Sequence, residues 1–531
     1  MVQRETQSAA YWRDKFSLGA DDIEYLYSLL LERNQPQPID SLALALVQRH
    51  CQMEEVAIRA ELQRGTLYQP KDKYRTGEQL VFPRFDYATA TVIGQRAGHN
   101  PQYGDFTVLQ VEFEGNGGVR EFVADFSHPH PLNLDEGQTL AEAAGLASPQ
   151  ELYEAYQENI EAKLLAALET SDEFIDFRGQ WFLKGLLVPI HDGHLNIAEA
   201  AIDIKEVPLP VADLLKDLDL PANIPVETQA ISMNAALRAD SRFENVGPKG
   251  QVRWYLRRLE PPQATQMPRH LQLPKLSFDL DRFDSELRRL LSEIDDEATD
   301  PALVRPAISD AETVVVTLNY PHRRAGTLPL TPKTAAFFPE PDDRHVRITF
   351  VDKRSGEHMS GWVVSQNRYI YGLSEWYTRN QLPVGAYISL YGTDDPLTVM
   401  IDYQPVRLKR EWIRVAVPRD GQLSFQLLKQ PITCEYDDLT LMGVGDWVGL
   451  DALWTNAEQP NQRPLLTSLR QLFPELVKLN PQGAVHAKTL YSAVNIVRRC
   501  APGPIFHELS TRACFIPMGH GYWTYDPSIQ P

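Results

Sequence analysis

The sequence lacks the features that mark membrane-spanning, secreted and zinc-knuckle proteins. No run of about 18 apolar residues occurs in its 531 residues, which argues against a membrane-spanning helix. The first residues are polar and lack the apolar segment of a secretory signal. The four cysteines, Cys51, Cys434, Cys500 and Cys514, form no C-x-x-C pair. These absences predict a cytoplasmic protein with reduced thiols and no membrane partner.

Recognisable catalytic motifs are also missing. No P-loop, G-x-S-x-G or H-E-x-x-H pattern is present. His191 and His194 flank Asp192 at a spacing that suits a metal, but no third ligand lies nearby in the sequence. Asp192 with Asp203-Ile204-Lys205 is similar to the carboxylate and lysine set of a Mg²⁺-dependent nuclease, yet Asp203 falls in a predicted helix. We therefore expect no enzyme, cofactor or metal, and keep a nuclease as an alternative.

The charge balance limits how this chain could bind nucleic acid. Its net charge is −19 and its pI about 5.2. Affinity for nucleic acid comes largely from neutralised phosphates, so a general DNA coat is excluded. An acidic chain can still bind DNA where basic residues cluster locally.

Blocks of helical and period-two hydrophobicity alternate along the chain and predict an α+β, multi-domain protein. The expected segments are an N-terminal helical part (1–70), a small β barrel (71–133), a helix with a hairpin (134–190), a helical unit with a hairpin (191–262), an acidic proline-rich linker (263–312), a second β-rich domain (313–450) and a C-terminal unit (451–531). The linker is predicted to be solvated around one amphipathic helix, Phe283–Ile294. Its acids include Asp279, Asp281, Asp284, Asp295, Asp296, Glu297 and Asp300.

A repeated pattern closes three of these segments. In each, a helix ends in leucine, a phenylalanine six residues later opens a strand, a glycine turn follows, and an aromatic pair returns. The three sets are Leu168, Phe174, Gly179 and Trp181; Leu237, Phe243, Gly247 and Trp254; and Leu509, Phe515, Gly519 and Trp523. The order predicts a helix followed by a two-stranded wing, with glycines at the turns and the tryptophan over the core edge.

Residues 195–259 carry a further likeness. Ala198–Ala201 lies in the first predicted helix, Val207–Pro210 forms a proline turn, and Val211–Leu218 reads as a short second helix before the leucine, phenylalanine and tryptophan tail. This order resembles the HARE-type winged helix-turn-helix family, found in the delta subunit of bacterial RNA polymerase, restriction endonucleases and chromatin proteins. The likeness is weaker at 464–527, where the helix before the wing is short, and at 21–187, where the first barrel would be an insertion.

Local basic clusters accompany the predicted wings. A recognition helix in the major groove, with a wing on the phosphates, needs such a face. The candidates are Arg238, Arg242, Lys249, Arg253, Arg257 and Arg258 in the middle unit, and Lys488, Arg498 and Arg499 in the C-terminal unit.

The second β-rich block, about 313–420, resembles the plant B3 domain and related DNA-binding pseudobarrels. Leu373, Trp376, Asn380, Leu382 and Gly385 match the scaffold positions of that family. Ala386 departs from it, since the family usually has aspartate there. The resemblance implies a barrel that grips DNA with hairpins at its ends. The basic residues available in this block are Arg344, Arg347, Lys353, Arg354, Arg368, Arg407, Lys409 and Arg410, of which Lys353, Arg354 and Arg368 are the chosen candidates.

Together these patterns predict a modular protein that binds double-stranded DNA in transcription or genome maintenance, associated with the nucleoid. Several weak modules on one chain would gain affinity through effective concentration. The rival hypothesis is a protein–protein adaptor associated with RNA polymerase, which the acidic net charge and the aromatic wings favour.

Overall fold

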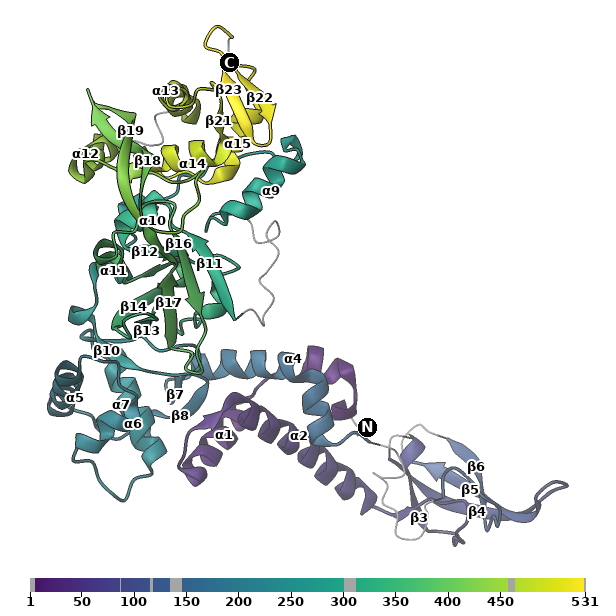
Figure 1. Ribbon diagram of the computed structural model, residues 1–531. Helices are drawn as coiled ribbons and strands as arrows, with labels where there is room; N and C mark the ends of the chain where they lie inside the picture. The colour runs from purple at the N-terminus through teal and green to yellow at the C-terminus, as the bar shows by residue number, and fades with distance from the viewer. Residues whose placement is uncertain are drawn as a thin grey trace. The chain divides into compact units, whose positions relative to one another are not determined.

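The computed structural model describes residues 5–85, 87–114, 118–133, 146–299, 312–456 and 464–529. Two compact bodies divide the chain: Met1–Ile190 with Asp219–Ala235, and His191–Leu218 with Ala236–Pro531. Both mix helices and strands, which confirms the α+β prediction at that level (Figure 1). Among the described helices, none has both the length and the apolar character that crossing a bilayer requires.

Long helices and a small sheet form one part of the first body. The helices are α1 (Ala20–Arg33), α2 (Ile39–Leu62) and α4 (Pro149–Thr170), and the hairpin strands are β7 (Phe174–Phe177) and β8 (Gln180–Leu183). The short strand β1 (Gln37–Pro38) between α1 and α2 pairs with β8, so the strand order is β1-β8-β7. Ser148 accepts a hydrogen bond from the Glu151 amide and fixes the start of α4.

A five-stranded sheet is inserted between α2 and α4. Its strands, in the order β2-β3-β4-β5-β6, are β2 (Thr66–Leu67), β3 (Gln79–Phe82), β4 (Ala88–Asn100), β5 (Gly104–Phe113) and β6 (Val119–Ala124). Tyr68, Phe82, Leu109 and Val111 form its buried core. The amides of Asp125 and Phe126 donate to the carbonyls of Asp72 and Pro70, which ties together the segments that follow the two edge strands.

The second body opens with a second helix and hairpin set. In chain order it has α5 (Asp192–Lys205), α6 (Val211–Leu214), α7 (Val226–Ala239, whose first part belongs to the first body), β9 (Phe243–Asn245) and β10 (Trp254–Leu256). Leu209, between α5 and α6, exchanges two backbone hydrogen bonds with Trp254 of β10. A single bridge residue therefore takes the place that β1 has in the first body.

A seven-stranded sheet follows. Its order is β11-β16-β17-β13-β14-β15-β12, and all neighbours are antiparallel except β13 and β17. The strands are β11 (Thr313–Thr317), β12 (Thr327–Pro329), β13 (Val346–Asp352), β14 (His358–Val364), β15 (Tyr369–Tyr371), β16 (Tyr387–Tyr391) and β17 (Thr398–Tyr403). Short helices α10 (Tyr320–Ala325) and α11 (Ser374–Arg379) interrupt them, and Trp376 of α11 is fully buried in their core.

Gly385 shows why the sequence needs a glycine in this domain. Its φ is +95°, and a Cβ there would lie 2.8 Å from the Leu441 Cα. The positive φ disfavours any L residue at this position, and the short distance to the Leu441 backbone excludes a Cβ atom. The residue thus allows the segment before β16 to pack against the segment before β20 (Gly443–Val444).

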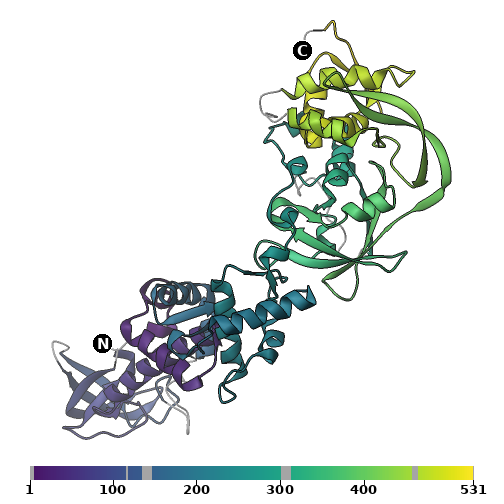
Figure 2. The same cartoon turned by 90° about the vertical axis from the view of Figure 1, so that its left-hand side faces the viewer.

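A long hairpin continues from the seven-stranded sheet. It consists of β18 (Pro405–Arg419) and β19 (Gln422–Cys434), joined at Asp420 and Gly421, which both have positive φ as a type I′ turn requires. Figure 2 shows it as a curved ribbon that runs beside the C-terminal helices. At its distal end the hairpin is extended by another strand, β20, which pairs with Val415 and Ala416.

The C-terminal segment repeats the arrangement of the first body. It contains α13 (Leu465–Val477), β21 (Val485–His486), α14 (Ala487–Val497), α15 (Pro502–Thr511), β22 (Phe515–Gly519) and β23 (Tyr522–Tyr525). The strand order is β21-β23-β22. The remaining helices of this body are α8 (Pro262–Thr265), α9 (Ser285–Ile294) and α12 (Trp447–Asn456).

The prediction that the linker is solvated is wrong for two of its acidic residues, which are buried. Asp296 and Glu297, which follow α9, are 2% and 4% exposed and both bind the guanidinium of Arg499 at 2.6–2.8 Å. The Tyr491 hydroxyl donates to Asp296 over 2.6 Å, and His322 lies 3.2 Å from Glu297. Burial opposes ionisation of Glu297, but Arg499 and His322 outweigh it and hold the pKa of that carboxyl below its usual range. Asp300 lies outside the described residues.

Candidate nucleic-acid interface

Three parts of the chain share one order of elements, and we call them the first (α1–β8), middle (α5–β10) and C-terminal (α13–β23) helix–hairpin units. In each, the repeated leucine, phenylalanine and tryptophan are at most 7% exposed. The tryptophan of the returning strand lies opposite the first strand or bridge residue. These pairs are Trp181 with Gln37, Trp254 with Leu209, and Trp523 with Val485. The repeat in the sequence therefore corresponds to an equivalent strand pairing in all three units.

In the first and C-terminal units, the helix before the hairpin lacks a basic surface that could enter a DNA groove. Helix α4 carries five glutamates and one lysine, and that lysine, Lys163, donates to backbone carbonyls of residues 12–16. Helix α15 is packed against α9, and its Gly503 lies directly under the Phe278 ring. A recognition helix needs an accessible cationic face, which neither α4 nor α15 offers.

Most of the predicted basic residues of the middle unit lie beside carboxylates. Arg242 binds Asp240 and Glu199, Arg257 binds Glu244, and Arg258 binds Asp203. Lys249 is exposed but lies 3.5 Å from Glu340. Arg238 is exposed at the end of α7, and Arg253 is half-buried. Acidic neighbours cancel much of the local field that a phosphate would meet.

The loop of the middle hairpin is covered by the seven-stranded domain. The Lys249 amide donates to the Glu340 carbonyl, the Asp342 amide to that of Gly247, and the Arg347 amide to that of Val246. A wing whose backbone is used in this way cannot follow a DNA backbone.

The three cations predicted as DNA contacts in the C-terminal unit lie largely in its interior. Arg499 is 2% exposed and bound by Asp296 and Glu297, and Arg498 is 6% exposed. Lys488 has a 14% exposed side chain and is paired with Asp437. In the sequence these residues look like one helix face, but α14 is buried along most of its length, and Arg498 and Arg499 follow its end in the interior of the unit.

The cations of the seven-stranded domain are more accessible. Lys353 is exposed beside the Tyr391 ring, with its Nζ 3.6 Å from the ring centroid. Arg354 is exposed near Asp402 and over Tyr403. Arg368 is half-buried in the turn before β15. They come from two different turns, before β14 and before β15.

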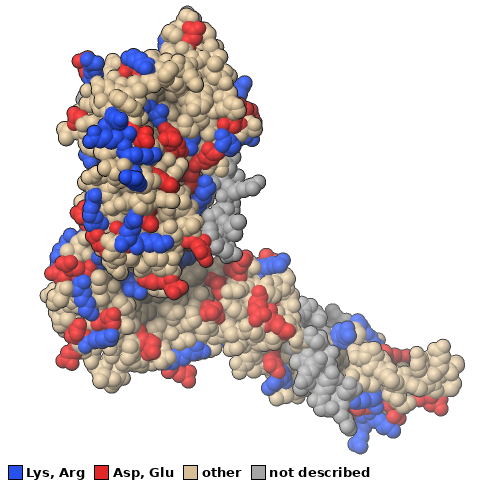
Figure 3. Space-filling view, in the orientation of Figure 1, with Lys and Arg blue, Asp and Glu red and all other residues tan. Residues whose placement is uncertain are grey.

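The sequence reasoning named Arg407, Lys409 and Arg410 among the available cations but did not recognise the strongly basic β18–β19 hairpin that carries them. It carries six Lys or Arg residues and two acids in a chain of net charge −19. Its middle, 407–412 and 426–431, is mostly exposed on both faces. Figure 3 shows lysine and arginine side chains gathered over the place where Figure 1 labels these strands. The clue in the sequence was Arg407, Lys409 and Arg410 around exposed apolar residues in one long strand.

On one face of this hairpin, an exposed tryptophan ring lies next to several Lys and Arg side chains. Trp412, 66% exposed, lies between Arg410 and Arg414 along β18, because alternate residues of a strand share a face. Lys429 lies directly opposite Trp412 on β19, and Leu427 is opposite Arg414. We call these five residues the Trp412 face.

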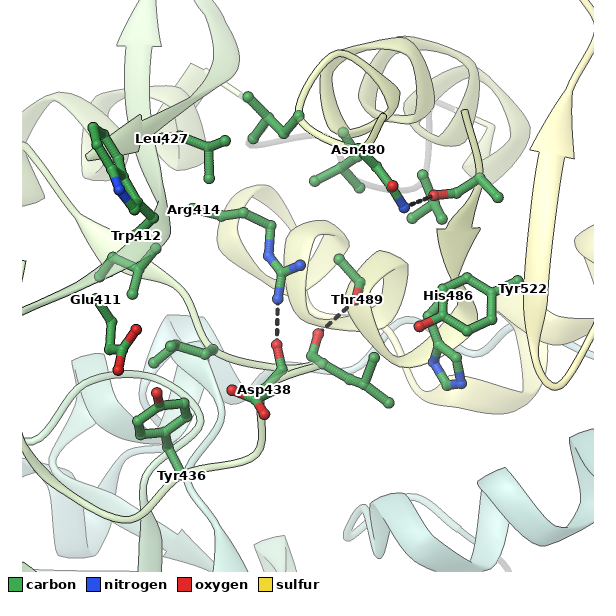
Figure 4. Close-up of a pocket in the computed structure, with 17 residues that line it drawn as sticks. Glu411, Trp412, Arg414, Leu427, Tyr436, Asp438, Asn480, His486, Thr489 and Tyr522 are labelled. Atoms are coloured by element: carbon green, nitrogen blue, oxygen red, sulfur yellow. Dashed lines mark hydrogen bonds between the residues drawn. The ribbon is translucent and has the colours of Figure 1, made fainter. Parts of the chain in front are cut away.

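Beneath the Trp412 face lies a pocket of about 250 Å³. Figure 4 shows Trp412, Arg414 and Leu427 on one wall, with His486, Thr489 and Tyr522 of the C-terminal unit on the other. Arg414 donates to the Asp438 carbonyl, and among the described residues its Nε has no hydrogen-bond partner. Arg414 therefore places a guanidinium at the wall of a pocket that Trp412, Tyr436 and Tyr522 also line.

Burial sets the protonation of the two basic side chains here. It lowers the pKa of Arg414, yet an arginine remains charged at neutral pH. Burial also lowers the pKa of His486 to about 4, so this imidazole is neutral at pH 7. Its Nδ1 accepts a hydrogen bond from the Lys488 amide. Arg414 is thus the cation that the pocket offers to an anion.

The histidine pair and the nuclease-like carboxylates that were weighed in the sequence do not converge on one site. Asp192 begins α5 and Asp203 lies three turns later, about 16 Å along the axis, so they cannot share one metal ion. The rings of His191 and His194 stack on each other 3.7 Å apart, and neither residue belongs to the one group of metal-ligand side chains found in the described part of the chain.

Comparison with protein-family models, with known proteins and with solved structures finds no match to this chain.

Proposed function

We propose that this chain is a modular DNA-binding protein that contacts the duplex through the β18–β19 hairpin. The observation that carries the proposal is the Trp412 face, an exposed aromatic ring between Arg410, Arg414 and Lys429 on an otherwise acidic protein. A two-stranded ribbon fits the major groove, and cations beside it neutralise phosphates.

We further propose that the three helix–hairpin units are winged helices and that the seven-stranded domain is a B3-like pseudobarrel. The common strand order and the shared tryptophan position support the first proposal. Seven strands interrupted by two short helices support the second. In this proposal the winged helices act as structural connectors, since α4 is acidic and α15 is covered.

The test is fluorescence anisotropy of the full chain with a labelled random 30-base-pair duplex at 50 and 200 mM salt. The Arg410→Ala, Lys429→Ala double variant should weaken binding about 10-fold and reduce the salt slope by about 2, since each phosphate contact contributes about 0.9. Arg59→Ala, an exposed and ion-paired arginine of α2, is the control and should bind as wild type. No binding at 50 mM salt, or full binding by the double variant, would contradict the proposal.

A protein partner, such as RNA polymerase, is the second candidate, and the exposed apolar side chains of the hairpin favour it. Leu408 is 63%, Leu427 41% and Leu428 40% exposed, beside Trp412. Apolar anchors with arginine are typical of protein interfaces. Purified RNA polymerase that binds the wild type but not Leu408→Ser, at an affinity little changed by salt, would replace DNA as the partner.

A further inference from the structure

Three side chains meet where the middle hairpin joins the seven-stranded domain. Glu244 lies on β9, Glu260 follows β10, and His345 directly precedes β13. Each offers one ligand atom, and these atoms lie within 4.8 Å of one another. Residues from three separate segments of the second body thus converge at one point.

The contacts of Glu260 and His345 are incomplete. Glu260 and His345 are 9% and 2% exposed, and the side chain of Glu260 is fully covered. Among the described residues, neither oxygen of Glu260 nor the His345 Nε2 has a hydrogen-bond partner. A buried carboxylate without hydrogen bonds is costly, so the environment must supply a positive charge close to it.

The separation of these atoms fits ligands of one ion. The His345 Nε2 lies 3.2 Å from the nearer Glu260 oxygen, yet the two are not aligned as a hydrogen bond. Two ligands held at about 2.0–2.1 Å by a tetrahedral ion lie about 3.3 Å apart. The three ligand atoms lie within 4.8 Å of one another, so the Glu244 carboxylate must move by at most about 1.5 Å to reach the tetrahedral separation.

We propose that Glu244, Glu260 and His345 bind a Zn²⁺ ion that fastens the middle hairpin to the seven-stranded domain. An imidazole with two carboxylates suits zinc better than calcium or magnesium, which prefer oxygen ligands alone. Three protein ligands leave a fourth position for water. Arg257, 3.1 Å from Glu244, orients that carboxylate from outside. The ion would reinforce the backbone hydrogen bonds between 246–249 and 340–347.

The test measures zinc binding to the full chain after treatment with a chelator. Wild-type protein should take up one Zn²⁺ per chain in competition with a chromophoric chelator, and zinc should raise its unfolding temperature while Mg²⁺ should not. His345→Ala and the isosteric Glu260→Gln should each weaken zinc at least about 100-fold. His358→Ala, which removes an exposed histidine from β14, is the matched control and should keep full affinity.

Two results would overturn the proposal. One is a wild-type protein that takes up no zinc, in which case His345 and Glu260 form an ion pair alone. The other is Glu260→Gln protein that is folded by circular dichroism and binds zinc as tightly as wild type, which would place the ion elsewhere. Cobalt substitution adds a readout independent of stability, because visible absorption bands of tetrahedral intensity should appear in wild type and be lost in both variants.

Discussion

The first and C-terminal helix–hairpin units share a strand order but differ in what surrounds it. In the first unit, α4 exposes its glutamates and the unit is interrupted by an inserted sheet. In the C-terminal unit, α14 is buried and its Arg499 is held by two carboxylates from the segment after α9. The same scaffold thus supports an acidic outer surface in one place and a charged interior in the other. Topology alone does not indicate which surface binds a ligand.

The largest expected effect would come from removing the buried cation that distinguishes the C-terminal unit. Arg499→Ala leaves Asp296 and Glu297 buried without their partner and should lower the free energy of unfolding by about 3–5 kcal/mol. Urea denaturation of the full chain, followed by fluorescence, measures this change. Arg512→Ala, which removes an exposed arginine paired with Glu508, is the control and should cost less than about 1 kcal/mol. Equal losses in the two variants would show that the buried Arg499 stabilises the C-terminal unit no more than an ion pair at its surface does.

The shared leucine tests what the two units have in common. Leu168 and Leu509 are 0% and 1% exposed at equivalent positions before the hairpin. Leu168→Ala and Leu509→Ala should each cost about 3 kcal/mol, because each leaves a cavity in its core. Thermal unfolding should show the losses in different transitions, since the residues lie in different bodies. A loss in only one variant would show that the repeat is not structurally equivalent.

The smallest expected effect is an acid sensitivity of the C-terminal unit. Burial lowers the pKa of His486 to about 4 from 6.5, near Lys488, Asp437, Glu286 and Arg289. Below pH 6.5 the unfolded chain therefore binds a proton at His486 that the folded chain does not bind. The free energy of unfolding decreases as the pH is lowered. Between pH 6.5 and 5 the loss is at most about 2 kcal/mol.

His486→Asn separates this effect from other titrations. Asparagine does not titrate and its side-chain oxygen can still accept from the Lys488 amide, as His486 does. The variant should therefore show a flatter stability profile from pH 6.5 to 5 in urea titrations. A profile as steep as that of wild type would assign the acid sensitivity to other groups.

Local patterns in the sequence located the hairpins well because they depend on neighbouring residues. The leucine, phenylalanine and tryptophan spacing identified three equivalent helix–hairpin junctions, including the split first unit. Exposure was harder to predict. Arg499 and Arg242 appear alike in the sequence, and only the packing of distant acids such as Asp296 and Glu199 decides that one is buried and the other paired at the surface.

The candidate interface was also hard to predict, because it depends on which residues meet in the folded chain. Six cations along β18 and β19 were visible in the sequence, but their common face depends on the register that pairs Trp412 with Lys429. The proposed metal ligands, Glu244, Glu260 and His345, are far apart in the sequence and follow no ligand spacing. Tertiary contacts of this kind cannot be derived from a single sequence.

The inserted sheet imposes an order on biosynthesis. Strand β1 finds its partner β8 only about 140 residues later, while β2–β6 are complete before α4 begins. At about 5–20 residues per second, the ribosome needs roughly 10–30 s to deliver that partner. During this time Leu26, Leu30 and Leu42 of the first two helices lack the third helix that completes their core. The core of the first helices is therefore completed only after the inserted sheet has been synthesised.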